Sequence, residues 1–276
     1  MFTAWKVASP LGIDLKIHWT FWLLPLWVIF TFEDSGFLPL WLHVFLIFPL
    51  FFCIVLHEYG HALMARHFGI GTRSITLSPL GGIAQLERMS RSPWEEFWIA
   101  IAGPAVNVVI AAILGTGLLV YALLDPGFQN VLWWRALGII FLVNIVLVIF
   151  NLLPAFPMDG GRVFRALLAG SFGMLTGTRI AIGVGTVMAI IMGLAGVLLL
   201  GNPWLIFIAL FVIWAGHQEL LTLEMEEHER RSIFDDDAPL VLGTPRADQA
   251  GMQVTICRWD AQRGRWVRQT YTDRTD

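Results

Sequence analysis

Long apolar stretches constrain this chain more than any other feature of its sequence. Each is close to or above the twenty or so residues that an α-helix needs to cross the hydrocarbon core of a bilayer. The chain of 276 residues is 57% hydrophobic and only 14% charged, which is too apolar for a soluble protein of this size. We therefore predict an all-α polytopic membrane protein with about six transmembrane helices, at residues 18–33, 38–66, 95–124, 133–152, 178–200 and 203–221.

The positions of lysine and arginine predict the orientation, because cytoplasmic segments of membrane proteins carry an excess of these residues. An even number of spans with both termini in the cytoplasm leaves Arg135 on the outside. The same arrangement places the other basic positions inside, namely Lys6, Lys16, Arg66, Arg73, Arg88, Arg91, Arg162, Arg165, Arg179 and the tail from Arg230 onward. We expect an integral protein of a bacterial or archaeal plasma membrane. The net charge of −3 is uninformative about nucleic acid, but the sequence shows no basic, aromatic-rich surface for it, so we expect no nucleic-acid partner.

The second apolar stretch contains the sequence His57-Glu58-Tyr59-Gly60-His61. On a helix, positions i and i+4 share one face, so the two histidines can bind one zinc ion. Glu58 lies close to that face and can act as a general base on a metal-activated water. A charge at mid-membrane costs roughly 2.5–3.5 kcal/mol on insertion scales, so such groups are usually functional. The alternative is a coincidental pair of core histidines.

Asp159 is the stronger of two candidates for a third metal ligand. Pro154 and Pro157 precede it and break the fourth span, and Gly160 begins a pair of glycines that allows the chain to turn sharply. Irregular backbone at membrane depth is tolerated where it faces protein or a wet cavity, so the carboxylate points toward an interior site. An N-cap of the following helix is its alternative role. Two histidines, one carboxylate and an open position are typical of one catalytic zinc ion per chain.

Cys53 is the other candidate, because it lies one helical turn before His57 on the same face. The simpler interpretation is a small buried apolar side chain. A disulfide between Cys53 and Cys257 is not expected, because one lies in a predicted span and the other in the predicted cytoplasmic tail.

Three ordered motifs resemble those of the site-2 protease family of intramembrane zinc metalloproteases. They are His57-Glu58-Tyr59-Gly60-His61, the Gly-Pro-x-x-Asn element from Gly103 to Asn107, and the Asn-x-x-Pro-x-x-Pro-x-Asp-Gly stretch from Asn151 to Gly160. The resemblance implies a zinc metalloendopeptidase that hydrolyses peptide bonds within or near transmembrane segments of membrane proteins. It also implies a role for each motif residue: His57, His61 and Asp159 as metal ligands and Glu58 as the general base.

The resemblance leaves two roles open for Asn107. Its amide would either hold the substrate or the oxyanion, or form an interhelical hydrogen bond. The expected partners are a transmembrane protein substrate, membrane lipid and a regulatory membrane protein, and the oligomeric state is open.

Two segments outside the spans carry strand patterns. Between the second and third spans, residues 74–78 alternate polar and apolar side chains and Gly81-Gly82 favours a turn, so we predict a small β-hairpin or re-entrant element. Either its edge would pair with an unwound substrate segment, or the segment is a plain amphipathic connector. We divide the chain into a transmembrane metalloprotease domain, 1–222, and a short cytoplasmic tail, 223–276, in which 252–259 and 265–272 form a possible β-hairpin.

Two other functions compete with proteolysis. A membrane metal transporter would use the histidine pair as a transit site, but the sequence shows neither an internal repeat nor polar residues strung along a pathway. A proteolytically inactive homologue that binds membrane partners is the third possibility, although all the expected catalytic residues are present.

Overall fold

The structure is a computed structural model that describes most of the chain. The described residues are 4–31, 38–79, 81–88, 90, 92–124, 131–199, 201–234, 240–241, 246–248, 251–260 and 265–272, with side chains described through residue 228. The chain forms two compact units, residues 1–220 and 221–276.

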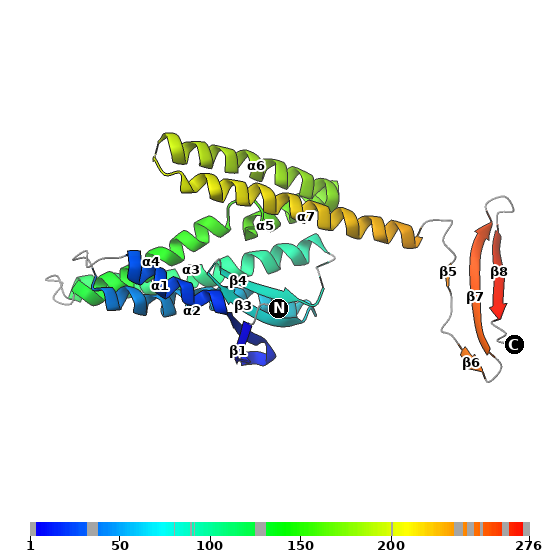
Figure 1. The fold of residues 1–276 in the computed structure, drawn as a ribbon, viewed down its shortest axis with the longest axis horizontal. Coiled ribbons are helices and arrows are strands. Elements are labelled where there is room, and N and C mark those ends of the chain that lie inside the picture. Colours follow the sequence, from blue (N-terminus) through cyan, green and yellow to red (C-terminus); the bar gives the residue numbers. More distant parts are fainter. Residues whose placement is uncertain are drawn as a thin grey trace. The chain divides into compact units, whose positions relative to one another are not determined.

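Helices make up most of the first unit, which confirms the predicted fold class (Figure 1). They are α1 (Leu23–Thr31), α2 (Leu40–His67), α3 (Pro93–Leu124), α4 (Val131–Asn151), α5 (Asp159–Phe172), α6 (Met174–Leu198) and α7 (Trp204–Phe234), the last of which continues into the second unit. Among the described residues, five helices are long and apolar enough to cross a membrane: α2, α3, α4, α6 and α7.

The first predicted span, 18–33, is shorter in the structure than the other five. A single 3-10 turn, Trp19–Trp22, leads into α1, and together they form an apolar helical segment of only thirteen residues, Trp19–Thr31. Residues 32 and 33 lie outside the described part. His18 belongs to a strand and caps the turn, because its ring nitrogen accepts a hydrogen bond from the main-chain N–H of Thr20.

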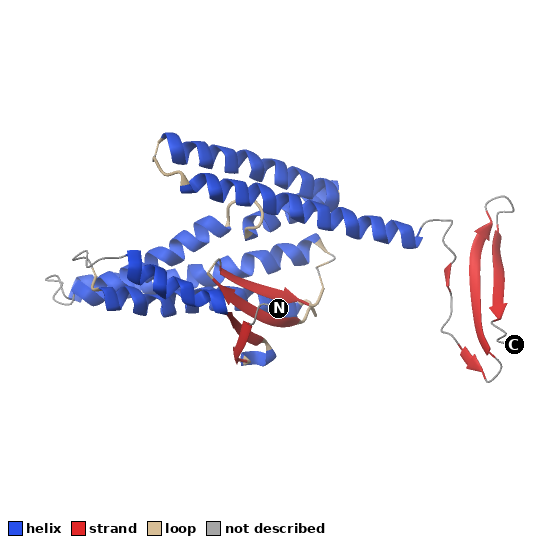
Figure 2. Cartoon of the chain, viewed as in Figure 1, coloured by secondary structure: helices blue, strands red, loops and turns tan. Residues whose placement is uncertain are grey.

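A four-stranded sheet stands beside the helices of the first unit (Figure 2). Its strands are β1 (Ala4–Ala8), β2 (Asp14–His18), β3 (Thr72–Ser78) and β4 (Gly81–Leu86), in the order β1-β2-β3-β4. The predicted hairpin between the second and third spans is present as the antiparallel pair β3–β4. The sequence analysis missed β1 and β2. β2 runs parallel to β3 in a register that pairs Asp14 with Ser74 and Ile17 with Leu77.

The sheet is attached to α2 through a compact apolar core. Ile13 and Ile75 pack against Val55, Tyr59 and Ala62 of the helix, and all five are buried. Tyr59 also donates a hydrogen bond from its hydroxyl to the main-chain oxygen of the turn between β1 and β2 (3.1 Å). The second position after His57 therefore holds the sheet against the helix that carries both histidines.

Glycine permits a close crossing of α2 and α3. A Cβ atom on Gly60 would lie 2.7 Å from the main-chain oxygen of Ala102 and 2.9 Å from Val106 Cγ2, closer than real contacts allow. Small residues at a helix interface are a common device for close packing in membranes. The small size of Gly60 therefore admits a partner helix.

The second unit contains the end of α7 and four strands. They are β5 (Leu240–Val241), β6 (Arg246–Asp248), β7 (Gly251–Asp260) and β8 (Arg265–Thr272). β7 and β8 are antiparallel in a continuous register from Gln253–Thr272 to Asp260–Arg265. The turn predicted at 261–264 lies outside the described residues. The cytoplasmic location of this unit stays a prediction.

Candidate metal centre

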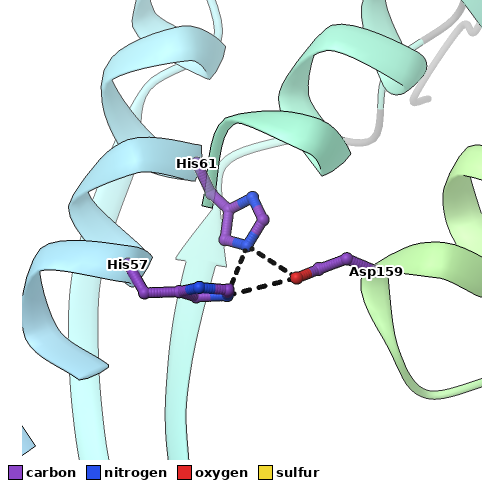
Figure 3. Close-up of side chains that lie close together, drawn as sticks. All are labelled: His57, His61 and Asp159. Carbon is purple, nitrogen blue, oxygen red and sulfur yellow. Dashed lines mark hydrogen bonds and ion pairs between the residues drawn. The ribbon is translucent and has the colours of Figure 1, made fainter. Parts of the chain in front are cut away.

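Two imidazole rings converge from successive turns of α2. His57 and His61 are each only 6% exposed, and their Nε2 atoms lie 3.1 Å apart (Figure 3). The four-residue spacing produces this arrangement because both positions fall on the same face of the helix. Both rings therefore present the same nitrogen to one point inside the helical bundle.

Asp159 brings a carboxylate to the same point from a different helix. Its Oδ2 atom lies 3.1 Å from His57 Nε2 and 3.2 Å from His61 Nε2, and the residue is 8% exposed (Figure 3). α4 ends at Asn151 and α5 begins at Asp159, so the proline-containing stretch breaks the helix as predicted. The carboxylate is consequently the first side chain of a new helix, directed across to α2.

Glycines allow α5 to pack tightly against the irregular loop 152–158. A Cβ on Gly160 would collide with the main-chain carbonyl of Leu152, and one on Gly161 would lie 2.7 Å from the carbonyl carbon of Ala155. A main-chain hydrogen bond from the Gly161 N–H to the oxygen of Met158 joins the loop to the first turn (3.1 Å). The position of Asp159 therefore depends on direct contact between the backbone of α5 and the backbone of the loop, with no side chain between them.

The three side chains fit a tetrahedral metal ion. Their donor atoms are two imidazole nitrogens and one carboxylate oxygen, all within 3.1–3.2 Å of one another. Ligands of a tetrahedral zinc at bond lengths near 2.0–2.1 Å are separated by about 3.3–3.4 Å. Within the part of the chain that the structure describes, His57, His61 and Asp159 are the only group of three or more His, Cys, Asp or Glu side chains so arranged.

The second nitrogen of each ring is hydrogen-bonded to α3. His61 Nδ1 donates to the main-chain oxygen of Ile99 at 2.7 Å, and His57 Nδ1 donates to Asn107 Oδ1 at 2.5 Å. Asn107 also donates from Nδ2 to Asn144 of α4 at 2.8 Å and is fully buried. Both ends of the Asn107 amide are engaged between helices, and its predicted contact with substrate stays a prediction.

α3 approaches the rings closely because it has a glycine there. A Cβ on Gly103 would collide with His61 Nε2 and would lie 2.8 Å from His57 Nε2. The Gly-Pro-x-x-Asn element thus contributes twice to the centre, through the space at Gly103 and through the amide of Asn107. The sequence showed the motif but not these contacts.

Glu58 stands beside the cluster, next to the sheet. It follows His57 on α2, is partly exposed, and does not belong to the three-residue group. Gly82 of β4 passes over it so closely that a Cβ there would lie 2.5 Å from Glu58 Cγ and 3.0 Å from Oε1. The final strand of the sheet is therefore in direct contact with the side chain predicted to be the general base.

Cys53 lies outside the ligand cluster. It is 5% exposed, and its Sγ accepts a hydrogen bond from Asn144 Nδ2 at 3.4 Å. The structure thus favours the simpler of its two predicted roles, a small buried side chain.

Sequence reasoning missed a buried ion cluster formed by Arg165 of α5, Glu96 of α3 and Glu219 of α7. Arg165 Nε donates to Glu96 Oε1 at 3.0 Å, and its Nη1 donates to Glu219 Oε1 at 2.5 Å. Arg165 and Glu96 are each 3% exposed. Burial alone would lower the pKa of Arg165, but the two carboxylates hold it above its ordinary value. The sequence analysis assigned Arg165 only to an inside segment. The available signal for the ion cluster was a charge two turns into the helix that carries Asp159.

Comparisons with known proteins agree with this geometry. The model of peptidase family M50 matches residues 45–125 and 122–194. A zinc metalloprotease from Methanocaldococcus jannaschii is 38% identical over 221 residues, which are 80% of this chain and 62% of that protein. Rip3 of Mycobacterium tuberculosis is 34% identical over 234 residues, 75% of this chain and 56% of that protein. The chain thus spans somewhat more than half the length of these relatives.

A solved structure is similar across most of the chain. The site-2 protease from Methanocaldococcus jannaschii superimposes with a TM-score of 0.54 and 33% sequence identity, and the match covers 79% of this chain and 95% of the solved one. The buried His-His-Asp cluster, the family match over residues 45–194 and this structural likeness lead to one conclusion: the chain belongs to peptidase family M50, the family of the site-2 proteases.

Proposed function

We propose that the protein is an intramembrane zinc metalloprotease that hydrolyses peptide bonds within or near the transmembrane segments of membrane proteins. The observation that carries this proposal is the convergence of His57, His61 and Asp159 inside a bundle of apolar helices, with Glu58 beside them. The names of the relatives, zinc metalloprotease and site-2 protease, support it.

In this proposal, His57 Nε2, His61 Nε2 and Asp159 Oδ2 hold one zinc ion. When bound, zinc lowers the pKa of a coordinated water and polarises a carbonyl. Glu58 accepts the proton of the attacking water and returns it to the leaving amine, so it is needed for turnover and not for metal binding. Its position under Gly82 keeps the carboxylate close to the cluster while leaving it partly open to a substrate.

β4 is the proposed docking edge for the substrate. It is the last strand in the order β1-β2-β3-β4, and no described strand pairs with its outer edge. A transmembrane helix must be extended before its peptide bonds become accessible, and an exposed edge stabilises an extended segment through main-chain hydrogen bonds. Because Gly82 lies directly over Glu58, a segment added to this edge passes next to the general base.

The proposed setting is a bacterial or archaeal plasma membrane, with both termini in the cytoplasm. The apolar helices and the excess of basic residues on the predicted inside segments support it. Membrane lipid and a transmembrane substrate are the expected partners, with a regulatory membrane protein as a further one. A reporter enzyme that is active only in the cytoplasm, fused after residue 276, is expected to be active.

Cleavage by matched variants tests the proposal. A panel of tagged single-span membrane proteins is co-expressed with wild type, Glu58→Gln or Glu87→Gln, and fragments are read on a gel. Glu87 is an exposed residue immediately after β4, so Glu87→Gln makes the same chemical change in the same unit, away from the cluster. Wild type and Glu87→Gln are expected to produce a fragment that Glu58→Gln does not.

Zinc content distinguishes a base from a ligand. Purified Glu58→Gln is expected to contain as much zinc as wild type, whereas Asp159→Asn is expected to lose most of it. A chelator should abolish cleavage by wild type, and added zinc should restore it. Equal cleavage by wild type and Glu58→Gln would contradict the proposal, and zinc uptake into vesicles containing the protein would favour a transporter instead.

A further inference from the structure

A chain of three hydrogen bonds leads away from the back of His57 across two neighbouring helices. His57 Nδ1 is joined to Asn107 Oδ1 (2.5 Å), Asn107 Nδ2 to Asn144 Oδ1 (2.8 Å), and Asn144 Nδ2 to the main-chain oxygen of Ile140 (2.8 Å). The three side chains come from α2, α3 and α4, and neither asparagine has any exposed surface. Both asparagines are therefore closed off from water.

The chemistry of its far end gives this chain a single direction. The carbonyl oxygen of Ile140 can only accept, so Asn144 must place its NH₂ there and its amide oxygen toward Asn107. Asn107 must then donate to Asn144 and turn its own oxygen toward His57. An oxygen facing Nδ1 requires a proton on Nδ1, so the neutral ring carries its lone pair on Nε2. Nε2 is the atom that faces Asp159 and His61.

His61 reaches the same state in one step. Its Nδ1 donates directly to the main-chain oxygen of Ile99, which also can only accept. A main-chain carbonyl therefore determines which nitrogen is protonated in each ring. For His61 this carbonyl is the direct partner of Nδ1, and for His57 it lies at the far end of three hydrogen bonds. Asn107 and Asn144 together thus place the proton of the His57 ring on Nδ1, as the carbonyl of Ile99 does directly for His61.

We propose that Asn107 and Asn144 are positioning residues that select the Nδ1–H tautomer of His57 and orient its ring, so that Nε2 is available to a metal ion. The inference rests on the proposed role of His57 as a metal ligand. Outer partners of metal-bound histidines fix tautomer and orientation in this way, and their loss typically weakens metal binding about 10–100-fold. A direct role of Asn107 in holding substrate is not needed to explain its burial.

A purely structural role for the two asparagines makes different predictions. Hydrogen bonds between helices in membranes contribute modestly to stability, so losing one would lower stability a little and leave zinc affinity per folded molecule unchanged. A positioning role predicts the reverse: a large loss of zinc affinity in a protein that is nearly as stable. Zinc affinity and ring tautomer are therefore the decisive measurements.

The experiment uses full-length protein in detergent micelles with four variants and zinc as the probe. Asn144→Leu removes the group that sets the direction of the chain, and Asn107→Leu removes the acceptor itself. Both are expected to weaken zinc binding about 10–100-fold in competition with a chelating dye. Asn107→Asp keeps an acceptor for Nδ1 but as a carboxylate cannot donate to Asn144 Oδ1, so it is expected to bind zinc more tightly than Asn107→Leu and less tightly than wild type. Cys53→Ala removes the other contact of Asn144 without altering its direction and is expected to bind zinc as wild type does.

The tautomer is measured directly on metal-free protein. Nitrogen-15 spectra of labelled histidine distinguish a protonated Nδ1 from a protonated Nε2, and His57→Gln identifies the signal of His57. Wild type, Cys53→Ala and Asn107→Asp are expected to show protonated Nδ1, whereas Asn144→Leu is expected to show a mixture. Thr178→Val, which removes a fully buried hydroxyl on α6, controls for the loss of any buried polar group.

The outcomes separate this inference from the proposed function. If His57→Gln leaves zinc affinity unchanged, the proposed ligand set fails. If zinc affinity depends on His57 while Asn144→Leu alters neither affinity nor tautomer, the ligand set stands and this inference is overturned. Thermal melting of each variant shows whether the compared samples are equally folded.

Discussion

The two sides of the metal centre are held in place by different means. On the histidine side, each ring of α2 is fixed by a directed hydrogen bond to α3, and α3 leaves only the space of a glycine at Gly103. On the aspartate side, Asp159 is the first residue of α5, and its place depends on close backbone contacts at Gly160 and Gly161. The histidines are thus positioned through side-chain chemistry and the carboxylate through backbone packing.

This difference follows from what each ligand requires. An imidazole binds a metal through one of two nitrogens, so its proton must be placed as well as its ring. A carboxylate accepts through either oxygen and needs only to be delivered to the right point. The ion cluster of Arg165 lies further along α5, the helix that carries Asp159, and it connects α5 to α3 and α7. We therefore expect substitutions on the histidine side to affect metal binding, and those at the ion cluster of Arg165 to affect stability first.

The largest effect is expected from Gly103→Ala, which places a methyl group against both Nε2 atoms. Because neither imidazole can move without leaving Asp159, zinc affinity should fall by roughly 100-fold or more. Gly117→Ala on the same helix is the matched control, since nothing lies within 4 Å of the added Cβ. Isothermal titration with zinc measures both, and near-normal affinity of Gly103→Ala would show that the rings are not confined by α3.

Arg165→Met is expected to lower stability more than metal affinity. It leaves Glu96 buried without its partner, which typically costs about 3–5 kcal/mol. Arg162→Met is the comparison, because the side chain of Arg162 is 31% exposed and stands 3.8 Å from the same carboxylate. That change should cost no more than about 1 kcal/mol. Denaturant unfolding in micelles gives both values, and zinc binding of the folded fraction should change less than tenfold.

A smaller effect is expected from Gly161→Ala, which pushes α5 away from the loop that carries Ala155. The carboxylate of Asp159 should shift by a fraction of an ångström, and zinc affinity should fall about tenfold. Gly170→Ala in the same helix meets nothing within 4 Å and should stabilise the protein by roughly 0.5–1 kcal/mol. Equal zinc affinities for the two variants would mean that backbone packing does not set the position of Asp159.

Removal of the metal is the mildest of these perturbations, and it should reveal the difference between the histidine side and the aspartate side. A chelator is expected to increase hydrogen exchange in the loop 152–158 and the first turn of α5 more than in α2, because Asp159 is held by close backbone contacts whereas each histidine ring has a hydrogen bond to α3. The difference should be no more than about tenfold in exchange rate. Mass spectrometry of peptides from the two regions measures it, and equal deprotection of both would remove the distinction drawn above.

The clustering of His57, His61 and Asp159 could be predicted in large part because local patterns place these three side chains. The spacing of His57 and His61 brings the two rings together whenever the segment is helical. The prolines before Asp159 predict a helix break from the local sequence alone. The roles of Asn107 and Arg165 could not be assigned in this way. Their partners come from other helices, so they depend on how α3 crosses α2 and α5, which no local pattern specifies.

The N-terminal strands show a different kind of miss. Residues 14–18 alternate polar and apolar side chains, which is a strand pattern, but the apolar stretch that follows led to a predicted span beginning at 18. The partner of this segment is β3, some sixty residues later in the sequence. The tertiary partner was the information that the local pattern lacked.

The parallel pairing of β2 with β3 has a consequence for synthesis. The ribosome releases the N-terminal hairpin of β1 and β2 first. β3, the other neighbour of β2, emerges only after α2 has been made and placed in the bilayer. The sheet, and with it the passage of Gly82 over Glu58, is therefore completed only after α2 has been synthesised. A nascent chain that already carries both histidines still lacks β4, the proposed docking edge, and Asp159, so the proposed proteolytic activity is expected only after the start of α5 has been synthesised.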